Sequence, residues 1–230
     1  MCAVGSVTPY EIARRAVAPF MPALEGEVAA LLAEAVPTGA TLLDVGGRKS
    51  PYTIGLPVSV TVSELPRESE HQHQHNLGLD DAGVAALRRT RSNVAGVVFD
   101  DMSCSALGAA SFDAAVAVEV IEHVDDDEGF VRNLARVVRP GGPVVLTTPN
   151  GDARPVHGAD HRRHYRRDQL IKLVTPYFDV VFVRYAVAMT DNRLVGMQPF
   201  SPRRPRWAAN RVACSGPGSR RSSRCRRRVW

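Results

Sequence analysis

The sequence predicts an α/β fold, namely a doubly wound and mostly parallel sheet with helices on both faces. Short apolar runs rich in valine, leucine and alanine recur along residues 41–148, and helical apolar spacing fills most segments between them. Strands that are apolar throughout and alternate with helices are typical of parallel sheets covered on both faces. Several of these runs stop at glycine or at an acid, where open sheets of this kind bind their ligands.

The expected elements alternate along the chain. Residues 8–36 have helical apolar spacing, and Pro19 and Pro22 divide them into two helices, the first with Thr8 as cap and Pro9 as first helical residue. Further helices are expected at 80–91, 125–139 and 168–175, strands at 41–45, 58–65, 93–101, 114–118, 143–148 and 178–185, and a short or irregular first crossover at 48–57, which contains two prolines.

The run at 41–45 ends in a glycine turn that predicts a ligand site. Gly46 and Gly47 let backbone amides approach a ligand closely, and Asp44 before them is costly to bury unless turn amides or the ligand satisfy it. Glu64 ends the next expected strand, about 20 residues later, where an acid can bind a ribose hydroxyl pair. The two features together predict an adenosine-containing cofactor.

The glycine spacing argues against a dinucleotide fold, because residues 46–51 lack the Gly-x-Gly-x-x-Gly fingerprint. The chain instead resembles the class I S-adenosylmethionine-dependent methyltransferases, whose first strand closes with Asp-x-Gly-x-Gly-x-Gly. It keeps Asp44, Gly46 and Glu64 but carries Arg48 and Ser50 where the later glycines of that motif fall.

Two further blocks carry the same resemblance and indicate the small-molecule type. Residues 111–124 read Ser-Phe-Asp, an apolar run and then Glu-Val-Ile-Glu-His-Val, and residues 134–142 end in Arg-Pro-Gly-Gly. The segment 161–170 also looks like the family's stretch after its fifth strand. The resemblance spans about residues 38–185.

The resemblance implies S-adenosylmethionine as the cofactor and assigns a role to each matching residue. Asp44 would orient the turn or the ammonium group of the cofactor, and Gly46 and Gly47 would lie under its methionine moiety. We expect Arg48 or Lys49 to contact the methionine carboxylate, since arginine pairs well with carboxylates. The remaining contacts would be Glu64 to both ribose hydroxyls, Leu65 against the adenine, Asp101 to the adenine amine, the Met102 amide to a ring nitrogen, and Glu119 beside the methionine portion.

Three histidines are candidates for a catalytic base. Methyl transfer from a sulfonium is an in-line displacement, in which a hydroxyl nucleophile must lose a proton to a base within hydrogen-bond reach. Imidazole titrates near neutrality, which makes His123, His161 and His164 the candidates. We favour His161, because His123 recurs in the resembled family as part of a structural Glu-His pair. A packing or capping role is the alternative for each of them.

Composition indicates a mildly acidic domain with a basic tail. Residues 199–230 contain ten arginines and no acid, so the other 198 residues hold 19 basic and 24 acidic side chains. We expect an N-terminal helical cap at 1–37, a cofactor-binding domain at 38–198 and a disordered tail at 199–230. The 27 arginines against two lysines span the chain, which indicates coding preference rather than nucleic-acid binding.

Other classes are set aside on the sequence. His71, His73 and His75 alternate, but no completing ligands are evident nearby, so we read 70–75 as a solvated polar loop and expect no metal. Without a signal pattern, a spanning segment or a disulfide framework, a cytoplasmic protein is expected. The predicted function is methylation of a small-molecule or sugar-type acceptor, at oxygen; the alternatives are a non-catalytic, cofactor-sensing protein and a nucleic-acid methyltransferase.

Overall fold

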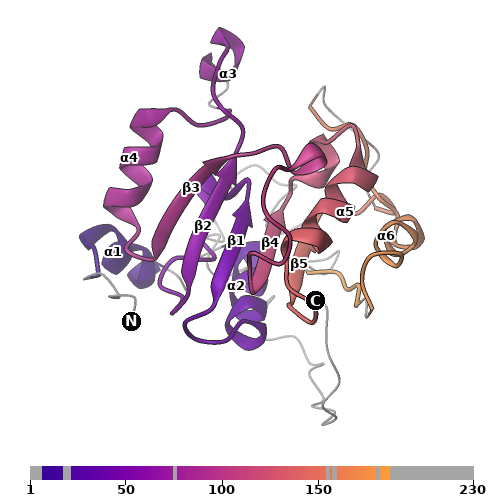
Figure 1. The fold of residues 1–230 in the computed structure, drawn as a ribbon, viewed down its shortest axis with the longest axis horizontal. Coiled ribbons are helices and arrows are strands. Elements are labelled where there is room, and N and C mark those ends of the chain that lie inside the picture. Colours follow the sequence, from indigo (N-terminus) through magenta and orange to yellow (C-terminus); the bar gives the residue numbers. More distant parts are fainter. Residues whose placement is uncertain are drawn as a thin grey trace, which may run out of the picture.

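The computed structural model describes residues 7–17, 22–74, 77–153, 156, 160–179 and 182–186. Its centre is a sheet of five parallel strands in the order β3-β2-β1-β4-β5 (Figure 1). The doubly wound parallel sheet expected from the sequence is thereby confirmed. The strands are β1 (Thr41–Val45), β2 (Ser59–Glu64), β3 (Val94–Phe99), β4 (Ala114–Val118) and β5 (Val144–Thr147).

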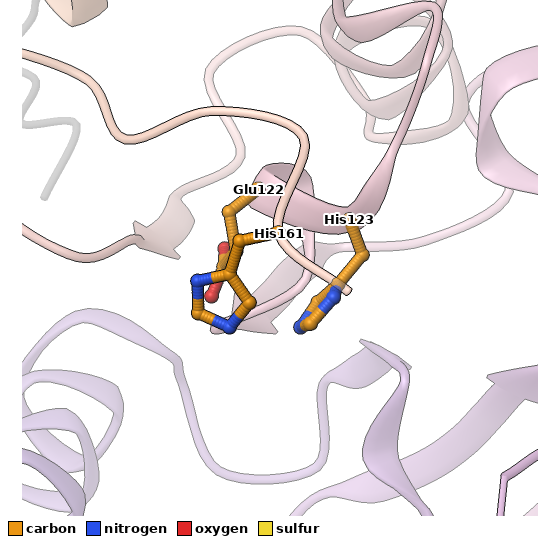
Figure 2. Close-up of side chains that lie close together, drawn as sticks. All are labelled: Glu122, His123 and His161. Atoms are coloured by element: carbon orange, nitrogen blue, oxygen red, sulfur yellow. The ribbon is translucent and has the colours of Figure 1, made fainter. Parts of the chain in front are cut away.

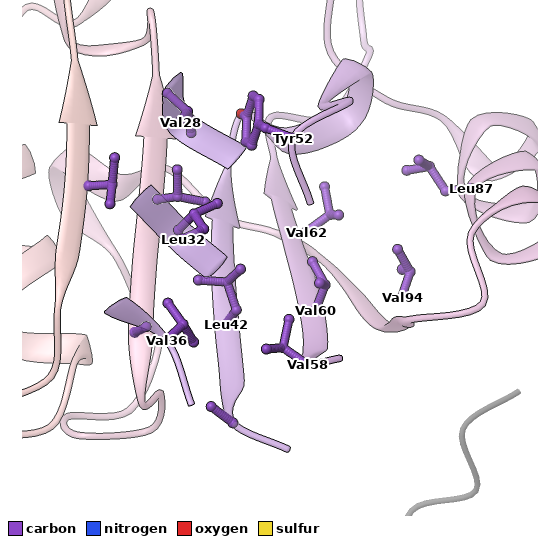
Figure 3. Packing of buried hydrophobic residues seen from close by; sticks show 14 of the residues in the cluster. Val28, Leu32, Val36, Leu42, Tyr52, Val58, Val60, Val62, Leu87 and Val94 are labelled. Atoms are coloured by element: carbon purple, nitrogen blue, oxygen red, sulfur yellow. The ribbon is translucent and has the colours of Figure 1, made fainter. Parts of the chain in front are cut away.

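Successive side chains of the strands face opposite layers of the core, because the side-chain period of a strand is two residues. Leu42 packs in one cluster with buried side chains of α2 (Ala23–Ala35) and α4 (Asp81–Thr90), as Figure 3 shows. Leu43 packs in a second cluster with α5 (Asp127–Val137) and α6 (Arg167–Val174). Helices therefore cover both faces of the sheet, and the strands present their carboxyl ends along one edge.

The N-terminal segment begins as the sequence predicted. In α1 (Pro9–Val17) the Glu11 amide donates to Thr8 Oγ1 at 3.2 Å, and the Thr8 amide donates back to Glu11 Oε2 at 2.8 Å. This reciprocal capping satisfies two amides at the start of the helix. Glu11 also accepts from the amide and hydroxyl of Ser92, which fastens α1 beside the start of β3.

The first crossover is irregular, as expected from its prolines. A single 3₁₀ turn, η2 (Gly47–Lys49), follows β1, and turns then lead to β2. Two other short elements interrupt the crossovers at the same end of the sheet, η3 (Met102–Cys104) after β3 and η4 (Ile121–His123) after β4. Short 3₁₀ turns therefore follow β1, β3 and β4 directly at the carboxyl end of the sheet.

Two predictions of local structure need correction. The expected loop at 70–75 contains a short helix, α3 (Glu70–Gln74), because the Gln72 side chain accepts from the amides of Glu68 and Ser69 at its start. The strand expected at 178–185 is absent where the structure describes that segment, since 178–179 and 182–185 form no ladder. A β-favouring run needs a partner strand, and no strand beyond β5 lies in the described residues.

The expected division into 1–37, 38–198 and 199–230 stays a prediction. The tail at 199–230 and His75 lie outside the described residues.

Candidate active site

The candidate site lies where the strand order reverses, between β1 and β4. Open α/β sheets bind ligands in the crevice outside the carboxyl ends of such strands. Gly46 follows β1 in the left-handed conformation, with φ 68°, and its amide donates to the Ser63 carbonyl. A Cβ on Gly46 would lie 2.8 Å from the Val120 side chain, and one on Gly47 would lie 2.2 Å from the Asp44 carboxyl carbon. Both glycines are required by close packing at this turn.

Asp44 lies beneath that turn and is completely buried. Its carboxylate accepts from Tyr52 Oη and from Thr53 Oγ1, each at 3.2 Å, and Arg91 Nη2 lies 3.7 Å from Oδ2. Burial raises the pKa of Asp44, and Arg91 is the largest opposing influence. Of the two roles expected for Asp44, the geometry favours orienting the turn, because the carboxylate has no exposed surface that could meet an ammonium group.

Arg91 is a site residue that the sequence analysis missed. It is buried, it donates through Nη1 to the Gly47 carbonyl at 3.1 Å, and its Nη2 donates to Thr53 Oγ1 at 2.5 Å. One guanidinium thus joins the acid of β1, the glycine turn and the irregular crossover. In the sequence Arg91 is one of several arginines that close a helix, and nothing local marks it as the partner of Asp44.

Glu64 ends β2 and faces Arg48 on the glycine turn. The Arg48 Nε lies 3.9 Å from Glu64 Oε2, and both side chains are about 15% exposed. Burial raises the pKa of Glu64 and the Arg48 cation opposes that change. Arg48 therefore lies beside the expected ribose acid, and its contact with the methionine carboxylate stays a prediction.

The expected adenine contacts lie at the ends of β2 and β3. Leu65 is 47% exposed, which leaves its side chain available to a ring. Asp101 caps η3, with Oδ1 accepting from the Ser103 amide at 2.9 Å, so an adenine amine would bond to Oδ2. The Met102 side chain belongs to the core, and Asn133 Nδ2 donates to its carbonyl at 3.0 Å, which fixes this turn on α5.

Glu119 follows β4 in an uncommon backbone conformation. Its φ is 54°, a left-handed value that costs a non-glycine residue about 1–3 kcal/mol and is concentrated at functional sites. The Thr147 hydroxyl donates to Glu119 Oε1 at 3.0 Å, and the Glu119 amide donates to the Thr147 carbonyl. The strained turn places this acid between the ends of β4 and β5.

One turn further, Glu122, His123 and His161 come together. One ligating atom from each lies within 4.8 Å of the others, and Figure 2 shows the three side chains pointing into a common space. Glu122 is completely buried, and neither carboxylate oxygen has a hydrogen-bond partner among the described residues. Burial, followed by the nearby Glu119 carboxylate, raises the pKa of Glu122 to about 8, and the weaker influence of the Glu122 amide and the Thr148 hydroxyl opposes this rise.

His161 and His164 form a hydrogen-bonded pair beside this acid. His161 Nδ1 lies 2.7 Å from His164 Nε2, and His123 Nδ1 lies 2.8 Å from the Asp160 carbonyl oxygen. Burial, then the neighbouring His123 and His164, lower the pKa of His161. The structure thus brings together all three histidines expected as candidate bases, together with Glu122, which the sequence analysis did not select.

Backbone contacts and ion pairs hold the histidine segment in place. The amides of Arg162 and Arg163 donate to the Glu122 carbonyl, at 2.7 and 3.4 Å. The Arg163 guanidinium pairs with Asp127 at 2.6 Å, and the Tyr165 hydroxyl donates to the same carboxylate at 2.8 Å. The segment after β5 is therefore docked on the segment after β4. This docking joins residues about 40 positions apart, and local sequence does not announce it.

Comparison with known proteins assigns the chain to a family. Residues 20–202 match a family model described as a methyltransferase domain, so the chain belongs to this methyltransferase family. The resemblance to class I S-adenosylmethionine-dependent methyltransferases, predicted from the sequence, is confirmed.

Curated relatives match part of the chain. The ubiquinone biosynthesis O-methyltransferase of Xanthomonas axonopodis pv. citri is 33% identical over 118 residues, which are 50% of this chain and 45% of that protein. The protein of the same name from Methylocella silvestris is 55% identical over 42 residues, 18% of this chain and 16% of that protein. The chain thus spans less than half the length of these relatives.

Solved structures agree in fold. A Burkholderia thailandensis 1,6-didemethyltoxoflavin-N1-methyltransferase, solved with bound 1,6-didemethyltoxoflavin and S-adenosylhomocysteine, has a TM-score of 0.51 at 21% identity, covering 67% of this chain and 66% of that one. A Haemonchus contortus phosphoethanolamine N-methyltransferase 2, also solved with S-adenosylhomocysteine, has a TM-score of 0.50 at 18% identity, covering 66% of this chain and 36% of that one. At these identities the likeness concerns the fold. Among the described residues, no helix is both long and apolar enough to cross a membrane.

Proposed function

We propose that this protein is an S-adenosylmethionine-dependent methyltransferase that methylates an oxygen of a small-molecule acceptor. Membership of the methyltransferase family supports the reaction class, and the curated relatives named as O-methyltransferases support oxygen as the acceptor atom. The observation that carries the proposal is the cluster of Glu122 and three histidines, which lies beside the strand ends where the fold binds its ligands.

The cofactor would lie across the ends of the central strands. Its methionine portion would rest on Gly46 and Gly47, and its ribose hydroxyls would donate to Glu64. Leu65, Asp101 and the Met102 amide would receive the adenine. Glu119, held by Thr147 at the end of β4, would face the methionine portion. These assignments place the transferable methyl group toward η4, the side on which the histidines lie.

His161 is the base that the geometry favours. Its lowered pKa leaves the imidazole neutral near pH 7, which is the form that accepts a proton. As the acceptor oxygen attacks the methyl group, the new oxygen–carbon bond would form while the carbon–sulfur bond breaks. His161 would take the hydroxyl proton, and its hydrogen-bonded partner His164 would share the resulting charge.

A binding measurement tests the cofactor site. Glu64→Ala should weaken S-adenosylmethionine binding by about 1.5–3 kcal/mol, the usual scale of a hydrogen bond to a charged group. The exposed Glu68 lies on the same connection and gives a control, Glu68→Ala, that should bind normally. An unchanged affinity in Glu64→Ala, with the fold intact by circular dichroism, would contradict the ribose assignment.

A turnover measurement tests the reaction. The full chain would be given methyl-labelled S-adenosylmethionine and a panel of phenols, alcohols and amines. We expect labelled products from hydroxyl acceptors and a loss of at least about 100-fold in turnover for His161→Ala, the scale of general-base catalysis. Cofactor binding without transfer to any acceptor would favour the cofactor-sensing alternative, and exclusive labelling of amines would contradict methylation at oxygen.

A further inference from the structure

The cluster after β4 has the composition of a metal site. We propose that Glu122, His123 and His161 bind one divalent first-row transition-metal ion of the zinc type, with His164 positioning His161. The sequence analysis weighed only the 71–75 histidine repeat for metal binding. The residues proposed here come from two segments that meet only in the folded chain.

The distances suit a common ion after small rotations of the side chains. One ligating atom from each residue lies within 4.8 Å of the others. Zinc binds nitrogen and carboxylate ligands at about 2.0–2.2 Å, which separates the ligands by about 3–4 Å in a tetrahedral site. His123 is exposed, so its ring can make this adjustment without disturbing the core.

The hydrogen bonds leave one nitrogen of each ligating histidine available. His123 uses Nδ1 toward the Asp160 carbonyl, and His161 uses Nδ1 toward His164. Histidines that bind metal usually engage their other ring nitrogen with such a partner, which fixes the tautomer and the ring orientation. Nε2 is therefore the ligating atom of both rings, and His164 supplies the outer contact for one of them.

Glu122 provides the second and independent observation. A completely buried carboxylate without a hydrogen-bond partner is unfavourable unless it is protonated or neutralised by a cation. The nearby guanidinium groups already have partners, since Arg162 pairs with Asp125 and Arg163 with Asp127. A bound metal ion would therefore supply the positive charge that the Glu122 carboxylate lacks.

The donor set selects the class of ion. Two imidazoles and one carboxylate form the three-ligand set of catalytic zinc sites, and related sets bind other first-row ions. Mg²⁺ and Ca²⁺ prefer oxygen ligands and should bind poorly here. Three protein ligands leave an open position. Under the proposed function, that position would take the acceptor oxygen and favour loss of its proton to solvent water. The ion would then replace His161 as the group that activates the acceptor, because His161 Nε2 would be bound to it. Metal binding itself does not depend on that function.

Cobalt binding tests the site without cofactor or acceptor. The reference protein is the full chain with glutamine in place of His71, His73 and His75. These replacements remove the other group of histidines that could bind Co²⁺. After metal removal the reference protein would be titrated with Co²⁺ and then with Zn²⁺. We expect one Co²⁺ per chain with visible absorption bands, no thiolate charge-transfer band, displacement by Zn²⁺, and no displacement by Mg²⁺.

Variants in the same background assign the ligands. Glu122→Gln and His161→Gln should each lower Co²⁺ affinity by about 100-fold or more, His164→Gln by about 10-fold, and the exposed control Glu68→Gln not at all. Melting curves of the metal-free variants would verify folding. Equal Co²⁺ binding by the reference protein and His161→Gln would overturn the site, and unchanged binding by His164→Gln would overturn the positioning role. If the reference protein binds Co²⁺ but transfers no methyl group to any acceptor, the result would contradict the proposed function and leave the metal site standing.

Discussion

Asp44 and Glu122 are both completely buried carboxylates near the carboxyl ends of neighbouring strands, yet their surroundings differ. Asp44 has Tyr52, Thr53 and Arg91 around it. Glu122 has no hydrogen-bond partner for its carboxylate in the described part of the chain, and its nearest charged influence is another acid, Glu119. Burial is the same, so the partners decide what each acid can do.

The difference separates a structural acid from one available for chemistry. Burial raises the pKa of both groups, but a cation opposes it around Asp44, whereas around Glu122 only the Glu122 amide and the Thr148 hydroxyl oppose it. The Asp44 carboxylate is therefore occupied by Tyr52, Thr53 and Arg91. Glu122 retains its capacity to bind a proton, an acceptor hydroxyl or a metal ion. Glu64 is intermediate, because a single cation lies 3.9 Å from it.

Removing the partner of Asp44 should have the largest effect. In Arg91→Leu the buried Asp44 carboxylate would lose its cation, and breaking a buried pair in this way costs about 3–5 kcal/mol of folding free energy. Urea denaturation would measure the loss. The double variant Asp44→Asn with Arg91→Leu should recover part of it, since no isolated charge is left. A loss below about 1 kcal/mol in Arg91→Leu would show that the pairing of Asp44 matters little.

Glu122 should make the stability of the protein depend on pH. Its pKa is about 8 in the folded chain against 4.5 for the ordinary group, so between these values the folded state binds the extra proton. The contribution of Glu122 to stability is complete below about pH 4.5 and is lost as the pH rises through about 8.

The wild type minus Glu122→Gln isolates this effect. The difference in unfolding free energy should change by about 3 kcal/mol between pH 5 and pH 8, because the wild type becomes less stable relative to Glu122→Gln as the pH rises. Metal-free buffers are required, because a bound cation would replace the proton. A difference that stays flat over this range would show that Glu122 is ionised in the folded protein as it is in the unfolded chain, and that its pKa is not raised.

Asp44 and Glu122 also show which features of the fold and the site could be predicted from the sequence. The strand at 41–45, its glycine turn and the acid ending the next strand were predictable, because each is a local pattern within a few residues. The partner of Asp44 was not, since Arg91 lies 47 residues away and is one of 27 arginines. The docking of His161 on Glu122 depends on ion pairs between distant segments. The strand expected at 178–185 does not form at 178–179 and 182–185, the part of that segment that the structure describes, because β propensity does not supply a partner strand.

A third prediction concerns the intermediate case, Glu64. Arg48 opposes the burial that raises the pKa of Glu64, so Arg48→Ala should raise that pKa further. As the pH falls, Glu64 takes up a proton and cofactor binding weakens, and in Arg48→Ala this weakening should begin at a higher pH than in the wild type. At low pH the loss should approach the roughly 1.5–3 kcal/mol that is expected for Glu64→Ala. Titration calorimetry from pH 5 to pH 8 would measure it.

Adenosine distinguishes this role of Arg48 from the one expected from the sequence. If Arg48 acts through Glu64, adenosine binding should shift with pH in the same way, because adenosine carries the ribose. If Arg48 instead contacts the methionine carboxylate, Arg48→Ala should weaken S-adenosylmethionine binding and spare adenosine. If Arg48→Ala leaves the affinity for S-adenosylmethionine and for adenosine unchanged at every pH, both roles of Arg48 are ruled out.

The smallest expected effect tests whether Glu119 helps to keep Glu122 protonated. Glu119→Gln removes the charge but keeps an oxygen that can accept from the Thr147 hydroxyl, so the uncommon turn at residue 119 should persist. Loss of the neighbouring charge should lower the pKa of Glu122 and stabilise the protein at pH 8 by about 0.5–1 kcal/mol, the scale of one partly solvated charge pair. Glu128→Gln, which removes a charge at the start of α5 where it accepts from Tyr177, is the matched control and should leave the Glu122 titration in place. If Glu119→Gln leaves the pH dependence unchanged, burial alone sets the protonation of Glu122, and the contrast with Asp44 comes entirely from the missing partner rather than from the added acid.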